Sequence, residues 1–134
     1  MKSSKILKTY LIFSGLLLIF FGGATLLMPL ELKASFGINI PQNIDVLNDI
    51  RAYSALSLAI GILTVLGAFK SKLTYTSSLV VFIQFLALGF GRLLSMLLDG
   101  IQVAGIIGTA NEFFLGSIGA ILFIKYQEKN SGEN

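Results

Sequence analysis

The stretch Asn48-Asp49-Ile50-Arg51-Ala52-Tyr53 places polar and charged side chains at the start of a long apolar segment. Two later stretches repeat this pattern within apolar surroundings, namely Gly91-Arg92-Leu93-Leu94-Ser95 and Asn111-Glu112. Charged residues inside a membrane are energetically unfavourable, so they face the interior of a helix bundle and pair with one another. We therefore expect the three stretches to meet in one polar cluster inside a membrane protein.

The composition agrees with a membrane protein. Hydrophobic residues make up 54% of the 134 residues and charged residues only 13%, whereas soluble domains carry about 25% charged residues. The chain has no Cys and no His, which excludes disulfides, Cys/His metal sites and a histidine general base. We expect no metal and no cofactor. The net charge is +3. The positive residues lie at the ends of the apolar segments and form no basic stripe of the kind that binds nucleic acid.

Four apolar segments are long enough for membrane-spanning helices, which need about 20 apolar residues. They cover roughly residues 9–29, 47–69, 73–98 and 102–126. The predicted fold is all-α, a membrane four-helix bundle in a single domain over 1–134. Residues 31–47 mix apolar and charged side chains and contain Gly37 and Pro41, which predicts a short interfacial helix and a turn. A cleaved signal peptide is the alternative for the first segment, but no clear small-residue cleavage pattern follows it.

Lysines are unevenly distributed between the two sides that four spans define. One side holds both termini and the turn between the second and third spans, whereas the opposite loops contribute only Lys33. The positive-inside rule therefore places both termini in the cytoplasm, with the protein in the inner membrane. Tyrosines at the same ends of the spans are typical of an interfacial aromatic belt. The lysines on the cytoplasmic side are Lys2, Lys5, Lys8, Lys70, Lys72, Lys125 and Lys129. The tyrosines at these ends are Tyr10, Tyr75 and Tyr126.

Small and polar residues share one face of each span at 100° per residue, which predicts that these faces point inward. Two explanations remain open, plain helix packing and a cavity for a lipid-like ligand. The faces hold Ser14, Leu18, Gly22 and Thr25 on the first span; Asn48, Arg51, Ala52, Ala55 and Ala59 on the second; Gln84, Leu88, Gly91, Arg92, Ser95 and Asp99 on the third; and Gly105, Thr109, Glu112, Gly116, Gly119 and Ala120 on the fourth.

Glu112 is the deepest charge, and its short side chain cannot reach the membrane surface as an arginine can. We expect it to pair with Arg92, while Arg51 either completes a bidentate arrangement or bonds Asp49 and Asp99. The cluster is then a lock that fixes helix register, or a site that binds a headgroup or moves a proton. No catalytic residue is assigned. The predicted buried polar cluster is Asn48, Asp49, Arg51, Arg92, Ser95, Asp99 and Glu112.

These motifs resemble a bacterial four-helix integral membrane family of unknown function, near the DoxX-like group. The resemblance rests on Asn48-x-Ile50-Arg51, on Gly91-Arg92-x-x-Ser95-x-x-x-Asp99-Gly100 and on Asn111-Glu112. It covers nearly the whole chain and implies a multi-pass membrane protein. In that family a Pro often follows the Asp-Gly turn, whereas Ile101 and Gln102 stand here. DoxX-like relatives are linked to quinone-associated redox complexes.

Three classes of function are compatible with this pattern. The favoured one is a non-catalytic membrane protein that binds a lipid-like or quinone-like molecule, or serves as a small subunit of an envelope complex. The second is a membrane-embedded acid/base enzyme, such as an isomerase, that uses Glu112. The third is a small proton-coupled carrier, which at this size would act as a homo-oligomer. The expected partners are membrane lipids, a lipid-like or quinone-like ligand, and an envelope complex or further copies of the chain.

Topology is directly testable with reporter fusions. Fusions after Lys72 and after Asn134 are expected to report the cytoplasm, and a fusion after Gln42 the opposite side, because of the lysine asymmetry. A fusion after Asn134 that reports the outer side would contradict the predicted orientation.

Overall fold

The computed structural model describes residues 4–131, and this part of the chain is helical without any strand. Four of its helices are long and apolar enough to cross a membrane, which confirms the all-α bundle. A short helix lies between the first two of them, also as predicted. The helices are α1 (Lys5–Leu27), α2 (Pro29–Ser35), α3 (Ile44–Phe69), α4 (Ser71–Asp99) and α5 (Val103–Ser131).

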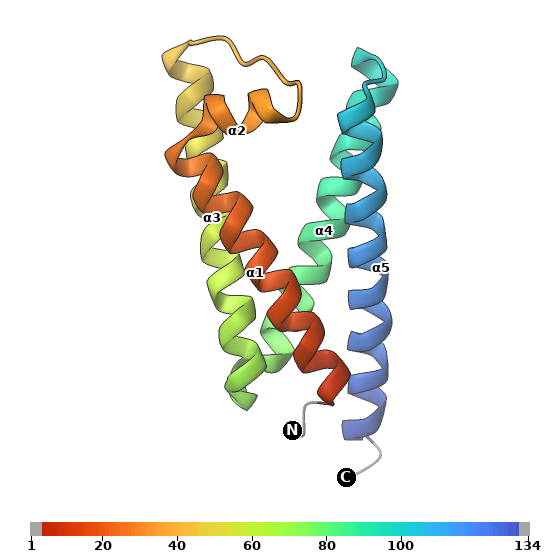
Figure 1. The fold of residues 1–134 in the computed structure, drawn as a ribbon. Helices are drawn as coiled ribbons and strands as arrows, with labels where there is room; N and C mark the ends of the chain where they lie inside the picture. The colour runs from red at the N-terminus through yellow and green to blue at the C-terminus, as the bar shows by residue number, and fades with distance from the viewer. Residues whose placement is uncertain (1–3, 132–134) are drawn as a thin grey trace.

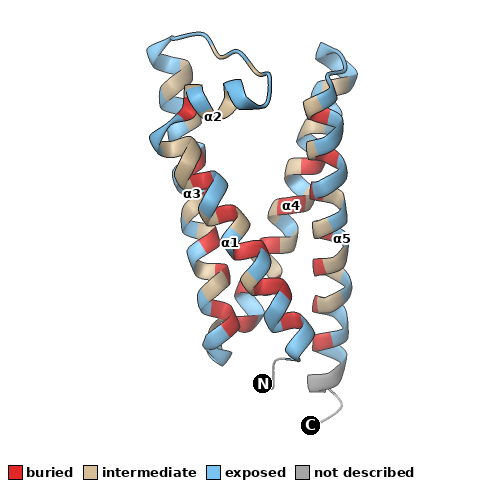
Figure 2. Cartoon of the chain, in the orientation of Figure 1, coloured by how far each residue is buried: buried red, intermediate tan, exposed pale blue. Residues whose placement is uncertain are grey.

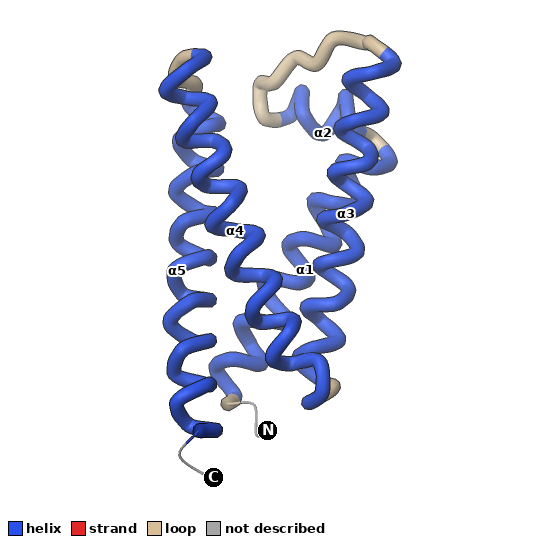
Figure 3. The backbone as a smooth tube through the Cα atoms, turned by 180° about the vertical axis from the view of Figure 1, so that it is seen from behind, coloured by secondary structure: helices blue, strands red, loops and turns tan. Residues whose placement is uncertain are grey.

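The bundle consists of two arms of two helices each (Figure 1). In the first arm α1 packs along α3, and in the second α4 packs along α5. Figures 1 and 3 show from opposite sides that the arms meet at the end where both termini lie, and that they separate toward the end where α2 lies. We call these the terminal end and the α2 end.

Glycines, which have no side chain, allow the two helices of the first arm to pack closely. A Cβ built on Gly61 would lie 2.8 Å from the backbone nitrogen of Ile19 and 2.9 Å from the carbonyl oxygen of Gly15. A Cβ on Gly22 would similarly lie 2.7 Å from the nitrogen of Leu58. The backbones of α1 and α3 are therefore in direct contact, which is how helices associate in lipid where no hydrophobic force drives them together.

Side-chain hydrogen bonds join the two arms toward the terminal end. The hydroxyl of Thr74 donates to the carbonyl of Gly67 at 2.8 Å, and the hydroxyl of Ser77 to the carbonyl of Leu63 at 2.8 Å. From α1, the phenol of Tyr10 reaches α5 and bonds the carbonyl of Leu115 at 3.0 Å. These bonds fix the joint between the arms.

Gln84, which was placed on the inward face of the third span, makes a hydrogen bond between the arms. Its Nε2 donates to the hydroxyl of Ser57 at 3.2 Å, from α4 to α3. Among the hydrogen bonds that join α3 to α4 in the described residues, this one lies nearest to the α2 end. Beyond it the arms diverge (Figure 1).

The inward faces of α1 and α5 are largely as predicted (Figure 2). Ser14, Leu18 and Gly22 are buried on α1, as are five of the six predicted residues on α5. The prediction for the second span is wrong, because Ala52, Ala55 and Ala59 are exposed. The buried face of α3 is instead Ser54, Ser57, Gly61, Thr64, Gly67 and Ala68.

The prediction for the inward face of α4 is also wrong in part. Its buried residues are Thr74, Ser77, Ser78, Val81, Phe85 and Gly89, and none of its residues after Gly89 is buried. Gly91, Ser95 and Asp99, which were predicted to point inward, are exposed. The reason is the separation of the arms, which leaves the last turns of α4 with α5 alone as a neighbour.

Helix α2 begins and ends at residues suited to those positions. Pro29 is its first residue, where the missing N–H is not needed and the fixed φ fits the helix. After its last turn Gly37 has a φ of 73°, a conformation that a side chain disfavours, and the chain then reverses toward α3. Helix α2 packs on α1 and α3, at the inner edge of the first arm (Figure 1).

Candidate functional site

An ion pair joins α4 to α5 in the half of the bundle toward the α2 end. The Nε of Arg92 donates to both carboxylate oxygens of Glu112, at 2.9 Å each. Opposite the guanidinium, α5 carries Gly108, and a Cβ there would lie 3.3 Å from that same Nε. The missing side chain lets Arg92 lie flat against α5. The predicted pairing of Glu112 with Arg92 is therefore confirmed.

The two partners differ in how far the protein covers them. The side chain of Glu112 is 12% exposed, whereas that of Arg92 is 41% exposed. Only the Nε of Arg92 is hydrogen-bonded within the part of the chain that the structure describes. Arginine carries further N–H groups on its two terminal nitrogens. Glu112 is thus neutralised, while the outer part of the guanidinium can still bind an acceptor.

The first arm contributes two polar side chains that interact with this pair. Lys33 of α2 is half-buried and interacts electrostatically with both Arg92 and Glu112. Burial lowers the pKa of Lys33, and the charge of Arg92 lowers it further, while Glu112 raises it. Tyr53 of α3 also interacts electrostatically with Glu112 and Arg92. We call Lys33, Tyr53, Arg92 and Glu112 the interarm polar group.

The remaining members of the predicted cluster lie elsewhere. Ser95 donates a hydrogen bond to Asp99 at 2.9 Å, but both residues are exposed near the end of α4. Asn48, Asp49 and Arg51 are exposed on the first turns of α3. Contrary to the prediction, these five residues do not lie in a buried cluster with Arg92 and Glu112.

The physical reason lies in the packing of α3. This helix contacts α1, α2 and α4 but does not pack against α5, and Arg51 is exposed on it, so that among the described residues the salt bridge of Glu112 is with Arg92 and not with Arg51. Its position near the start of α3 allows the long side chain to reach the membrane surface instead. Asn111, which precedes Glu112 in the third polar stretch, is exposed on α5.

Sequence reasoning missed two members of the interarm polar group. Lys33 was assigned to the loop side, although it is the only basic residue there and lies in an amphipathic segment, which was the available signal. Tyr53 closes the first polar stretch but was not included in the predicted polar cluster. Thr109 was placed on the inward face without a role. It is buried three residues before Glu112, and its Oγ1 has no hydrogen-bond partner among the described residues.

The family model for a domain of unknown function, DUF4345, matches residues 6–123, which is nearly the whole chain. The chain belongs to the DUF4345 family. Searches of curated proteins and of solved structures gave no match. The family match supports the predicted resemblance to a family of unknown function, and four apolar helices in this DUF4345 member are consistent with a membrane protein. Neither observation tests the relation to DoxX-like proteins.

A double-mutant cycle in bilayers tests the ion pair. Glu112→Gln and Arg92→Ala are each expected to lower the free energy of unfolding by about 2–3 kcal/mol, somewhat less than a fully buried pair would lose, because Arg92 is partly exposed. The double variant is expected to lose less than the sum of the two. Steric-trap unfolding measures all three.

The matched control is Glu112→Gln combined with Arg51→Ala. Arg51 is an arginine on the same half of the bundle that lies on a helix without contact to α5, so this pair should be additive. Additive losses for Arg92 and Glu112 would mean that the two side chains do not interact in the bilayer.

Proposed function

We propose that this DUF4345 protein is a multi-pass protein of the inner membrane that binds the polar headgroup of a lipid-like or quinone-like molecule at the interarm polar group. Both termini are then cytoplasmic, and the headgroup lies in the outer half of the membrane. The tail follows the exposed apolar surfaces of the two arms. The protein's role is binding, and no reaction is assigned to it.

The observation that carries this proposal is the incomplete use of Arg92. Among the described residues, Glu112 accepts hydrogen bonds only from the Nε of Arg92. The side chain of Arg92 remains 41% exposed, in the part of the bundle where the arms separate. An arginine that served only to neutralise Glu112 could give its terminal nitrogens to the carboxylate in a bidentate pair. Here those nitrogens are left for another acceptor, such as a phosphate, a carboxylate or a quinone carbonyl.

The charges around Arg92 favour the same kind of ligand. Two cations, Arg92 and Lys33, face one anion, Glu112, which leaves the group with an excess of positive charge. The pKa of Lys33 is lowered by burial and by Arg92, and a bound anion would oppose both effects by favouring the charged ammonium. An acceptor-rich headgroup would thus offset the repulsion between Lys33 and Arg92.

The apolar surroundings support an amphipathic molecule rather than a free anion. The helices around the polar group expose large apolar side chains, including Phe90 and Phe114. Thr109, one turn from Glu112, adds a buried hydroxyl without a partner among the described residues. The resemblance to DoxX-like proteins makes a quinone one form that the ligand could take.

Native mass spectrometry with lipids retained tests the proposal. The wild-type protein, purified in mild detergent from its own membrane, is expected to carry a stoichiometric small molecule. Arg92→Gln should bind this molecule about 10-fold or more weakly and therefore retain less of it, because a charge-assisted hydrogen bond contributes about 1.5–3 kcal/mol. Arg51→Gln is the matched control and should keep the ligand, since Arg51 lies outside the polar group.

The proposal fails if Arg92→Gln retains the same molecule at the same occupancy. It also fails if the wild-type protein carries no bound molecule but a stoichiometric protein partner. In that case the protein is a subunit of an envelope complex.

A further inference from the structure

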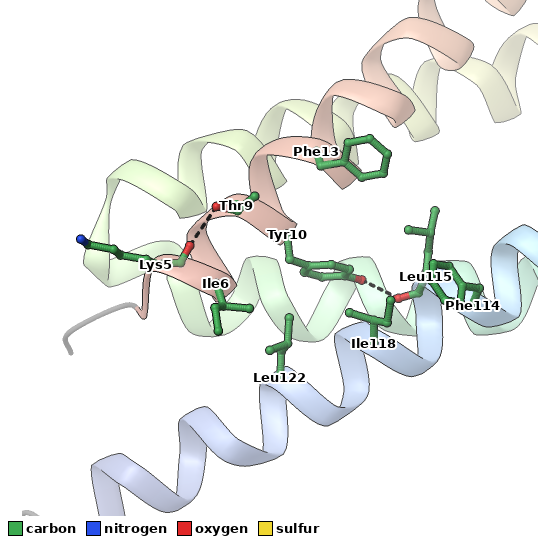
Figure 4. Close-up of a pocket in the computed structure, with 9 residues that line it drawn as sticks. All are labelled: Lys5, Ile6, Thr9, Tyr10, Phe13, Phe114, Leu115, Ile118 and Leu122. Carbon is green, nitrogen blue, oxygen red and sulfur yellow. Dashed lines mark hydrogen bonds between the residues drawn. The ribbon is translucent and has the colours of Figure 1, made fainter.

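A groove of about 440 Å³ lies between α1 and α5, in the half of the bundle toward the terminal end (Figure 4). Its sides are apolar and come from both helices, with Ile6 and Phe13 on α1 and Ile118 and Leu122 on α5. Neither Arg92 nor Glu112 lines it, so it is separate from the interarm polar group. Its volume lies within the range of about 300–1,000 Å³ that is usual for ligand pockets.

The two side-chain hydroxyls that line the groove already donate hydrogen bonds to the backbone. The phenol of Tyr10, whose ring lies between the two helices, donates to the carbonyl of Leu115 at 3.0 Å (Figure 4). The hydroxyl of Thr9 donates to the carbonyl of Lys5 at 3.0 Å. An occupant of the groove therefore meets hydrocarbon and side-chain hydroxyls that already donate to the backbone. This environment suits an acyl chain.

The mouth of the groove is basic. Lys5 is the one charged residue among those that line it, and its ammonium extends past the first turn of α1 (Figure 4). Nearby on α1, Lys8 is engaged elsewhere, with its Nζ 4.7 Å from the ring centroid of Phe69. The same end of the bundle carries Lys70 and Lys72 at the turn between α3 and α4. The charge at the mouth of the groove therefore complements an anionic headgroup.

We propose that this groove holds an acyl chain of an anionic phospholipid from the leaflet at the terminal end, with the lipid phosphate at Lys5. Tyr10 closes the inner side of the groove and holds α1 at the distance from α5 that leaves room for the chain. The bound lipid covers the seam between the two arms where they meet. This site is independent of the ligand proposed for the interarm polar group.

The test uses purified full-length protein in nanodiscs made of equal parts phosphatidylglycerol and phosphatidylcholine, followed by native mass spectrometry in mild detergent. The wild-type protein should retain one phosphatidylglycerol in preference to phosphatidylcholine. Lys5→Gln should lower this preference about fivefold, the factor that corresponds to about 1 kcal/mol for one basic residue at an anionic surface. Lys72→Gln is the matched control and should leave the preference unchanged.

A second pair of variants tests the groove itself. Thr9 is exposed and lines the groove, so Thr9→Trp should fill it and abolish retention of either lipid at this site. Leu16→Trp places the same side chain on an exposed part of α1 outside the groove and should retain the lipid. Circular dichroism of both tryptophan variants verifies that they fold.

Three outcomes would overturn the proposal. One is equal retention of phosphatidylglycerol and phosphatidylcholine by the wild-type protein, which would mean that Lys5 selects no headgroup. Another is undiminished phosphatidylglycerol retention in a folded Thr9→Trp variant, which would place the lipid elsewhere. The third is a lipid-free dimer that Thr9→Trp disrupts, because a second copy of the chain would then occupy the groove.

Discussion

The pairing of Glu112 with Arg92 is the interaction on which the second arm depends. A carboxylate within an apolar helix must be paired, protonated or expelled, and α5 presents Glu112 on the same buried face as its packing glycines. The partner comes from α4, one helix away in sequence, and Gly108 gives its guanidinium room to lie against α5. The pair therefore fixes the register of α4 on α5 at the end where no other helix helps.

The first arm is held together by a different means, and this difference explains the shape of the protein. Backbone contact at Gly15, Gly22 and Gly61 binds the middle of α1 to the middle of α3. Hydrogen bonds then join the arms toward the terminal end. The arms separate toward the α2 end, where Lys33 and Tyr53 of the first arm interact electrostatically with the ion pair of the second.

Much of the fold follows from the sequence, because span length and small-residue periodicity are strong local signals. The same reasoning paired Arg92 with Glu112, since both had to be neutralised at similar depth. It failed for α3, where the charge of Arg51 was given more weight than the run of Ser54, Ser57, Gly61 and Thr64. It could not find Lys33 as a site residue, because the position of α2 depends on the separation of the arms, which no local pattern encodes.

Isotope-edited infrared spectroscopy tests most directly whether Glu112 is ionised and paired with Arg92 inside the membrane. Protein labelled with ¹³C at the glutamate carboxyl groups and reconstituted in bilayers is compared with the Glu112→Gln variant at neutral pH. The difference spectrum is expected to contain carboxylate bands from Glu112. In the Arg92→Gln background the same difference should show a protonated carboxyl band instead. A protonated Glu112 in the wild-type protein would contradict the account.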